Sequence, residues 1–286
     1  MAKRARLKKS DKLHVQIIVT TWIVFSMIFC FIPLYLTVIN SFKSHYEIQQ
    51  SIFALPSFDF DVIAQNYSAA SGRVFQSMWN SIWTSAVTAV FHTILGSIMA
   101  YIFTRKEFPG REFFFRFYII ILLVPSVLGL TSLLDLTTSL GLSDSYFGLW
   151  VPTVLAGQAG AVFLFKTFFV QQPREIFESA KVDGANDFRI FIHMIVPMSY
   201  PIMLYNALGV FSGQYNDYTW SSLVISSADK RLLMPIIQSL ISGLESEHMR
   251  GAQYALYIIC SIPLMITTAI SIKYFQSGEF AAGLKL

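Results

Sequence analysis

Charged residues are scarce in this sequence. Only 13% of its 286 residues are Asp, Glu, Lys or Arg, whereas 54% are hydrophobic and 15% are aromatic. An ordinary soluble domain needs more charge to cover its surface, so the composition excludes that class and indicates a chain embedded in a lipid bilayer. The aromatic rings suit the interfaces at which membrane helices end.

Metal-ligand patterns and nucleic-acid-binding patches are also missing. The two cysteines, Cys30 and Cys260, lie inside apolar runs without the spacing of a metal site, so we expect both to be small buried side chains. The net charge of +4 does not indicate a nucleic-acid partner, because the basic residues cluster at the N-terminus and in short loops beside apolar stretches.

Catalytic motifs are missing as well. The sequence has no HExxH motif, no paired intramembrane aspartates, and no nucleophile with a convincing base among its five histidines. It has no Walker A loop, because Lys166-Thr167 follows Phe165 where that motif requires glycine. We therefore expect no catalytic residue and no metal site, and any ATP chemistry must come from another chain.

Six apolar stretches are each long enough to cross roughly 30 Å of hydrocarbon as a helix. They lack the alternation of a membrane β-barrel, and hydrocarbon offers backbone groups no water partners. We predict an all-α polytopic membrane protein with six transmembrane helices. The spans are expected near residues 14–38, 79–104, 113–137, 148–170, 194–224 and 252–274.

The distribution of Lys and Arg predicts that both termini are cytoplasmic. The first span follows a basic tail and is too long for the h-region of a signal peptide, so we expect it to be retained. The loops after the second and fourth spans are basic, whereas the loop after the third has no Lys or Arg. The basic residues are Lys3, Arg4, Arg6, Lys8, Lys9 and Lys12 in the tail, Arg105, Lys106 and Arg111 after the second span, and Arg174, Lys181 and Arg189 after the fourth.

These spans divide the chain into three parts. Residues 1–13 form a cytoplasmic basic tail, residues 14–275 the membrane domain, and residues 276–286 a cytoplasmic C-terminal tail. Within the membrane domain, residues 40–78 are expected to form a small folded cap on the outer face, and residues 171–193 a cytoplasmic loop.

The cytoplasmic loop has the pattern of two short helices. Pro173 suits the first position of a helix and Gly184 the left-handed residue that ends one, which predicts a helix of about ten residues. Asn186 or Asp187 should cap a second helix that continues into the fifth span, where Pro197 kinks the chain.

The first of these helices is amphipathic. Ile176, Phe177 and Ala180 are expected on one face. The opposite face carries Arg174, Glu178 and Lys181. Amphipathicity alone leaves open that this is simply a helix lying in the lipid interface.

The residue pattern narrows that choice. The chain reads Glu178-Ser179-Ala180, three residues to Asp183, Gly184-Ala185, and then Ile195-Val196-Pro197. This resembles the signature of ABC-importer inner-membrane permeases, which is Glu-Ala-Ala, three residues, Gly, and an apolar stretch closed by Leu-Pro. Ser179 replaces the first Ala and Val196 replaces the Leu.

The resemblance implies a type I ABC importer permease fold. In that fold the first helix of the loop is a coupling helix, which docks in a groove of a separate ATPase subunit and transmits its closure to the spans. The positions implied to couple are Glu178, Ser179, Ala180, Asp183, Gly184, Ala185 and Pro197.

Other motifs resemble the carbohydrate-importer branch, in the pattern of the shorter, six-span permease of maltose-type systems. They are Asn40-Ser41-Phe42-Lys43, Asn80-Ser81, Pro109-Gly110-Arg111, Tyr215-Asn216-Asp217-Tyr218 and the Gly-rich tail at 278–285. The resemblance implies a bacterial inner-membrane location, a carbohydrate cargo, a second homologous permease, an extracytoplasmic solute-binding protein, and two ATPase subunits that use ATP and Mg²⁺. This chain itself is expected to bind no cofactor.

Polar residues near the end of the fifth span are candidates for the translocation path. Amides, carboxylates and aromatic faces suit sugar hydroxyls and rings, but such residues also hold helices together. The candidates are Gln214, Tyr215, Asn216, Asp217, Tyr218 and Trp220. We expect the lone intramembrane His92 to be packed and hydrogen-bonded, and Gly209 and Gly213 to permit close helix approach.

Two other functions stay open at this point. The same architecture could import a non-sugar cargo, because the coupling signature carries no information about what crosses the membrane. A polytopic membrane enzyme is the remaining class, and the missing catalytic motifs argue against it.

Overall fold

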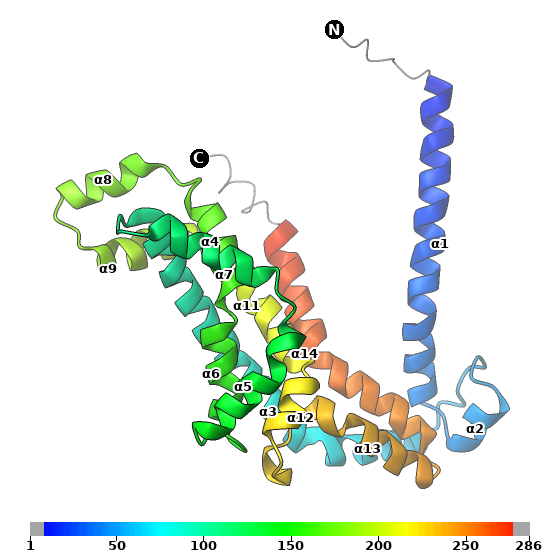
Figure 1. Ribbon diagram of the computed structural model, residues 1–286. Helices are drawn as coiled ribbons and strands as arrows, with labels where there is room; N and C mark the ends of the chain where they lie inside the picture. Colours follow the sequence, from blue (N-terminus) through cyan, green and yellow to red (C-terminus); the bar gives the residue numbers. More distant parts are fainter. Residues whose placement is uncertain (1–8, 277–286) are drawn as a thin grey trace. The chain divides into compact units, whose positions relative to one another are not determined.

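The computed structural model describes residues 9–276, and every regular element in that range is a helix (Figure 1). The predicted all-α class is therefore confirmed. The predicted basic residues up to position 8 and the Gly-rich tail from position 277 lie outside the described residues. The elements are α1 (Lys9–Ser41), α2 (His45–Gln50), α3 (Phe60–Arg105), α4 (Arg111–Leu122), η1 (Ser126–Gly129), α5 (Leu130–Ser139), α6 (Tyr146–Ala156), α7 (Gln158–Phe169), α8 (Arg174–Val182), α9 (Asp187–Ile190), η2 (Phe191–Ile195), α10 (Val196–Met198), α11 (Tyr200–Tyr215), α12 (Thr219–Val224), η3 (Ala228–Lys230), α13 (Leu233–Ser246) and α14 (Arg250–Gln276).

The helices that could span a membrane are of two kinds, single helices and bent helix pairs. Within the described residues, α1, α3 and α14 are each long and apolar enough to cross a membrane. Three helix pairs pass the same test together but are bent by 96°, 44° and 79°. If each bent pair is one span, the helices total six, which is the number that the apolar stretches predict.

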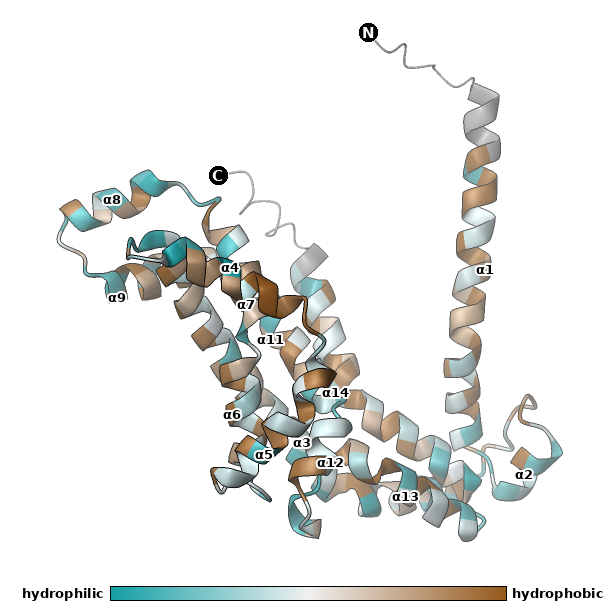
Figure 2. Cartoon of the chain, viewed as in Figure 1, coloured by the Kyte–Doolittle hydropathy of each residue, from teal (hydrophilic) through white to brown (hydrophobic). Residues whose placement is uncertain are grey.

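Most apolar residues of α1 from Val15 to Val38 have exposed side chains, whereas Ile39 at its C-terminal end is buried; Figure 2 colours the helix by hydropathy. Cys30 shares this exposure, so the prediction that it is buried is wrong, whereas Cys260 is buried as predicted. The physical reason is that the apolar side chains of a membrane span need not face a core of their own chain, so apolar character alone does not predict burial there.

The chain divides into two compact units, and the first comprises residues up to 73 together with 241–259. Its centre is the fully buried Lys43, whose Nζ donates to Asn40 Oδ1 at 3.0 Å and to the carbonyls of Ser51 at 3.1 Å and Ile52 at 3.2 Å. Asn66 Nδ2 donates to the Lys43 carbonyl at 2.9 Å. These bonds satisfy a buried ammonium group without a carboxylate.

The predicted cap over residues 40–78 differs from the structure. Its first part forms α2 and a loop, but residues 60–78 are the first turns of α3, which runs without interruption to Arg105. A hydropathy window locates only the apolar part of a helix, and nothing in this stretch stops the backbone from continuing beyond it.

The second unit comprises residues 74–240 and those from 260 onward, and it contains the loop at 171–193 that the sequence predicts to be cytoplasmic. Its main core joins α3, α7, α8, α9, η2 and α11. The helices approach closely at Gly96, where an added Cβ would lie 2.6 Å from Gln158 Oε1 and 2.8 Å from Ala161 Cβ. The core residues are Ala100, Tyr101, Ala161, Phe165, Phe168, Phe169, Phe177, Ile190, Phe191, Ile195 and Ile202.

The fifth predicted span is not one helix. A π-helical turn at residues 191–195 precedes Pro197, and the chain then bends by 79° at Ser199 before α11 begins. Proline removes a backbone donor and clashes with the preceding turn, so a bend here is expected. The further break after Tyr215 and the helix α13 were not predicted.

Candidate coupling site

The helix α8 is terminated by a left-handed glycine. The N–H of Gly184 donates to the Lys181 carbonyl at 3.0 Å, and the N–H of Ala185 donates to the Ala180 carbonyl at 2.9 Å. With Gly184 at φ +83°, this is a Schellman motif, which satisfies the last carbonyls of the helix. The helix has nine residues, close to the predicted ten, and Pro173 precedes it as the N-cap with an extended ψ of 130° instead of occupying the first helical position.

The second helix of the loop starts with a side-chain cap. Asn186 Oδ1 accepts from the N–H of Arg189 at 2.8 Å, which resolves the choice between the two predicted capping residues. Asp187 is thereby free to use its carboxylate elsewhere. Its Oδ2 pairs with Lys106 Nζ, and its Oδ1 accepts from the Tyr101 hydroxyl at 3.2 Å.

The faces of α8 differ in part from the prediction. Phe177 is 5% exposed and Ala180 packs against the core, as expected of the apolar face. Ile176, however, is 41% exposed, and Val182 is 88% exposed. The predicted polar face does not point away from the bundle, because Arg174, Glu178 and Lys181 line a pocket beside Phe177. The outward face is therefore formed by Glu175, Ile176, Ser179 and Val182.

Arg105 is a functional candidate, although in the sequence it is recognisable only as one of the basic residues that predict topology. One of its terminal nitrogens donates to the carbonyl of Phe169, the last residue of α7, at 2.8 Å and to that of Gln172, just after the helix, at 3.1 Å. Its guanidinium carbon lies 4.2 Å from the ring centroid of Phe177, in a cation–π contact. Arg105 thus joins the ends of α3 and α7 to the inner face of α8.

A hydrogen bond ties the same region to the bend in the fifth span. Gln172 Nε2 donates to the Ser199 hydroxyl at 2.8 Å, and both residues are buried. Because Ser199 is the residue at which the chain turns into α11, the start of α8 and the start of α11 are connected by one polar bond.

Comparison with known proteins places this geometry in a family. The model of the binding-protein-dependent transport system inner membrane component matches residues 92–279. The chain belongs to that family. The matched region includes α8, Gly184 and Pro197, which confirms the resemblance to importer permeases.

Several curated relatives of this permease are carbohydrate transport proteins by name. It is 28% identical to the alpha-glucoside transport system permease protein AglG of Rhizobium meliloti over 80% of this chain, but it spans only 61% of that relative. It is 25% identical to the polygalacturonan/rhamnogalacturonan transport system permease protein YtcP of Bacillus subtilis, covering 90% of this chain and 93% of YtcP. The maltodextrin transport system permease protein MdxG of Bacillus subtilis is 28% identical, over 72% and 74% of the two chains.

A solved structure has the same fold. A chain of a bacterial ABC transporter involved in the import of the acidic polysaccharide alginate superposes on this permease with a TM-score of 0.71. The two chains are 21% identical, and the match covers 94% of this chain and 99% of the other. The type I importer permease fold is therefore confirmed.

The six polar residues proposed for the translocation path of this permease separate into two groups. Tyr215 and Trp220 are buried, and they donate to the carbonyls of Cys260 at 2.9 Å and Gly148 at 3.1 Å. Asp217 caps α12 by accepting from the N–H groups of Trp220 at 3.2 Å and Ser221 at 2.8 Å. These three side chains hold helices together.

The other three candidates differ in exposure. Tyr218 and Asn216 are exposed, and Asn216 Nδ2 donates to the Ser212 carbonyl at 2.9 Å. Gln214 is buried, and its Nε2 has no hydrogen-bond partner within the described part of the chain. Of the six residues, Asn216 and Tyr218 have exposed side chains, whereas the unpartnered amide nitrogen of Gln214 is inaccessible.

His92 is packed and hydrogen-bonded. Its Nε2 lies 3.1 Å from the Gly157 carbonyl, and its Nδ1 lies 3.5 Å from Asn206 Nδ2. The glycines predicted to permit close approach, Gly209 and Gly213, have no heavy atom within 4 Å of an added Cβ in the described chain. Close approach occurs instead at Gly96 and Gly148, where a Cβ would lie 2.4 Å from the Leu142 carbonyl oxygen.

Proposed function

We propose that this chain is the non-catalytic permease subunit of an ATP-driven carbohydrate importer in a bacterial cytoplasmic membrane. It forms the translocation path with a second homologous permease and receives cargo from an extracytoplasmic solute-binding protein. Two separate ATPase subunits bind ATP and Mg²⁺ and supply the driving force. The supporting observation is the construction of α8, a short capped helix with one face fixed to the bundle and the other exposed.

The inner face of α8 provides a rigid mechanical connection. Phe177 fills a site in the main core, and Arg105 bonds the backbone at the C-terminal end of α7 while it covers the Phe177 ring. A displacement of α8 therefore acts on the ends of α3 and α7 at once. Close-packed interiors transmit such displacements, because side chains have no free volume in which to absorb them.

The outer face of α8 suits docking into a groove on an ATPase. Ser179 and Ala180 keep the helix slim, and Ile176 and Val182 expose apolar surface that a partner can cover. The Schellman motif at Gly184 turns the chain sharply at the end of α8. The segment that follows therefore does not cover the outer face of the helix. Glu178, Asp183, Ala185 and Pro197 complete the proposed coupling positions.

The carbohydrate assignment is supported by the relatives. The three described above are named for alpha-glucoside, polygalacturonan/rhamnogalacturonan and maltodextrin transport, so sugars are the chemistry that their names share. Asn216 and Tyr218 are the exposed residues of the proposed path, and Gln214 belongs to it as a buried side chain whose amide nitrogen has no partner among the described residues. Both termini are proposed to lie in the cytoplasm.

Cysteine cross-linking tests the coupling part of the proposal. In a chain carrying C30A and C260A, Ser179→Cys should cross-link to a cysteine placed in the groove of the ATPase. Ser143→Cys is the matched control, since Ser143 is an equally exposed serine in the loop between α5 and α6. Cross-linking from position 143, or none from position 179, would contradict the proposed docking face.

Cargo is tested separately. The assembled importer in a bilayer, supplied with its own solute-binding protein, should hydrolyse ATP faster with oligosaccharides than with amino acids, phosphate esters or polyamines. Stimulation by non-carbohydrates alone would remove the sugar assignment and leave the coupling assignment intact.

A further inference from the structure

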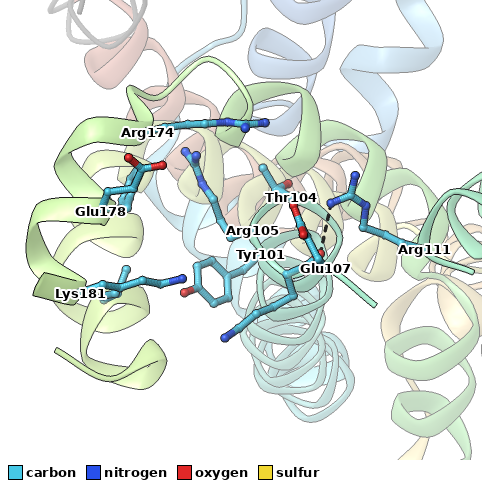
Figure 3. A pocket seen from close by; sticks show the side chains of 11 residues that line it. Tyr101, Thr104, Arg105, Glu107, Arg111, Arg174, Glu178 and Lys181 are labelled. Atoms are coloured by element: carbon cyan, nitrogen blue, oxygen red, sulfur yellow. Dashed lines mark hydrogen bonds between the residues drawn. The ribbon is translucent and has the colours of Figure 1, made fainter. Parts of the chain in front are cut away.

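A pocket of about 390 Å³ lies between α8, the end of α3 and the loop that leads to α4 (Figure 3). This volume falls in the range of small-molecule sites. Five of its lining side chains are cationic and two are carboxylates. The charged lining residues are Arg105, Lys106, Arg111, Arg174, Lys181, Glu107 and Glu178.

Three of the five cations lack a carboxylate partner. Lys106 pairs with Asp187, and Arg111 pairs with Glu112 at 3.3 Å. By contrast, neither Arg174 nor Lys181 forms an ion pair with any residue between positions 15 and 274. Figure 3 shows both side chains reaching from α8 toward α3.

Arg105 adds an unsatisfied donor to this group. Its Nε is buried and has no hydrogen-bond partner among the described residues. One of its two terminal nitrogens donates to the Phe169 and Gln172 carbonyls. A buried donor without an acceptor is costly, and like charges gathered in one pocket repel one another. An anion with several acceptor oxygens would relieve both conditions, and a phosphate group matches guanidinium donors best.

The surroundings of the pocket favour a phosphate that carries acyl chains. The pocket lies where the candidate spans containing α3, α4 and α7 end, which is the level of the lipid headgroups. The first turns of α4 expose three aromatic side chains there. They are Phe113, Phe114 and Phe117, exposed by 69%, 50% and 53%.

We propose that this pocket binds the phosphate group of an anionic phospholipid. Arg174, Lys181 and Arg105 Nε bind the phosphate oxygens, and the acyl chains lie along the aromatic surface of α4. Basic pockets between membrane helices are suited to such headgroups. The bound phosphate joins α8 to α3 through a replaceable ligand, while the outward face of α8 stays available to a protein partner. The inference holds for any cargo.

Native mass spectrometry of the assembled importer tests the site. The probe is a vesicle of phosphatidylcholine with added phosphatidylglycerol, and the measurement is the amount of phosphatidylglycerol that remains bound after detergent washing. The double variant R174Q/K181Q should weaken retention by about fivefold for each cation, hence about 25-fold in total. The control R116Q/R189Q removes the same charge from two exposed arginines outside the pocket and should retain the lipid.

A variant that is expected to increase lipid retention separates a specific effect from misfolding, because misfolding would lower retention. Glu107→Gln removes a negative charge from the pocket lining and should strengthen retention severalfold. Equal losses in both double variants, or no loss in R174Q/K181Q, would overturn the site. Displacement of the lipid by inorganic phosphate at equal concentration would identify free phosphate as the ligand instead. Loss of the ATPase subunits from R174Q/K181Q with unchanged lipid retention would assign the cations to acidic groups of the ATPase.

Discussion

The two ends of the bent span formed by α6 and α7 are built differently. At the start of α6, Asp144 accepts from the N–H groups of Ser226 at 3.0 Å and Ser227 at 2.9 Å, and Trp220 lies in a compact apolar cluster. After the end of α7, α8 is held through one buried ring, Phe177, and the guanidinium of Arg105. At the first end, which we call the closed end, the loops bond and pack against one another. At the second end, an exposed helix is held by a small number of contacts. An end of the second kind can be moved by a partner.

Removing the aromatic anchor at each end is expected to have the largest effect. Phe177→Ala leaves a cavity under α8 and should cost about 3–5 kcal/mol locally. We expect cargo-stimulated ATP hydrolysis to fall at least tenfold, on the order of the 1.4 kcal/mol that one decade requires, while the spans stay inserted. Stimulated hydrolysis per folded importer is the measurement.

Trp220→Ala is the matched change at the closed end. It removes a buried aromatic and its bond to the Gly148 carbonyl, so it should lower the thermal unfolding temperature. Folded importer should nevertheless keep its stimulated hydrolysis. Comparable loss of stimulation in W220A and F177A would mean that the two ends are not mechanically distinct.

An arginine at each end can be removed in the same way. Arg105→Gln removes two charge-assisted bonds and a cation–π contact, which together contribute about 2 kcal/mol. Hydrogen exchange of the α8 amides should accelerate by about tenfold or more as the helix detaches. Arg231→Gln is the counterpart, because the Arg231 guanidinium donates to the exposed Ser226 carbonyl at 3.1 and 3.3 Å. Unchanged α8 exchange in R105Q would argue against Arg105 as its anchor.

The third comparison uses two left-handed glycines. Gly184→Val forces a β-branched residue into φ +83° and should cost about 1–2 kcal/mol, with loss of the reversal that ends α8. An added Cβ has open space at both Gly184 and Gly141, which has φ +70° and lies in the loop before α6, so strain is the only difference from wild type. ATPase cross-linking from position 179 should fall in G184V and persist in G141V. A loss in both variants would assign the effect to general destabilisation.

The local features of α8 were predictable from sequence, whereas its anchoring was not. Proline and glycine bracket the helix through their own backbone preferences, so its bounds follow from neighbouring residues. Arg105 bonds carbonyls 64 and 67 residues away, and a backbone carbonyl has no residue type by which to recognise it. In the sequence, the positive charge of Arg105 at the end of a span is sufficiently explained by topology. Nothing in the sequence therefore indicates that it also anchors α8.

The proposed translocation path shows the same limit. Tyr215 and Trp220 look like sugar-binding aromatics in sequence, yet each donates its polar group to a distant carbonyl. A buried Tyr or Trp needs one such acceptor, and only the fold shows whether the chain supplies it.

The smallest effect is expected from the carboxylate at the closed end. Hydrogen bonds from the Ser227 hydroxyl and from the backbone of Ser227 and Ser226, together with Lys230, hold the pKa of Asp144 well below its usual range. A depressed pKa means that the folded protein favours the ionised carboxylate. The stabilisation is therefore complete above the unfolded pKa of about 3.9 and is lost only as the pH falls below it.

Asp144→Asn should therefore accelerate hydrogen exchange at Ser226 and Ser227 by a modest factor that is constant from pH 7 to pH 5. Asp229→Asn, in the adjacent turn, is the control, because the Asp229 side chain accepts none of the hydrogen bonds that close this end. Cargo-stimulated hydrolysis should be unchanged in both variants, since neither touches α8. If D144N instead reduced stimulation as strongly as R105Q does, the closed end would take part in coupling, and the contrast between the two ends would fail.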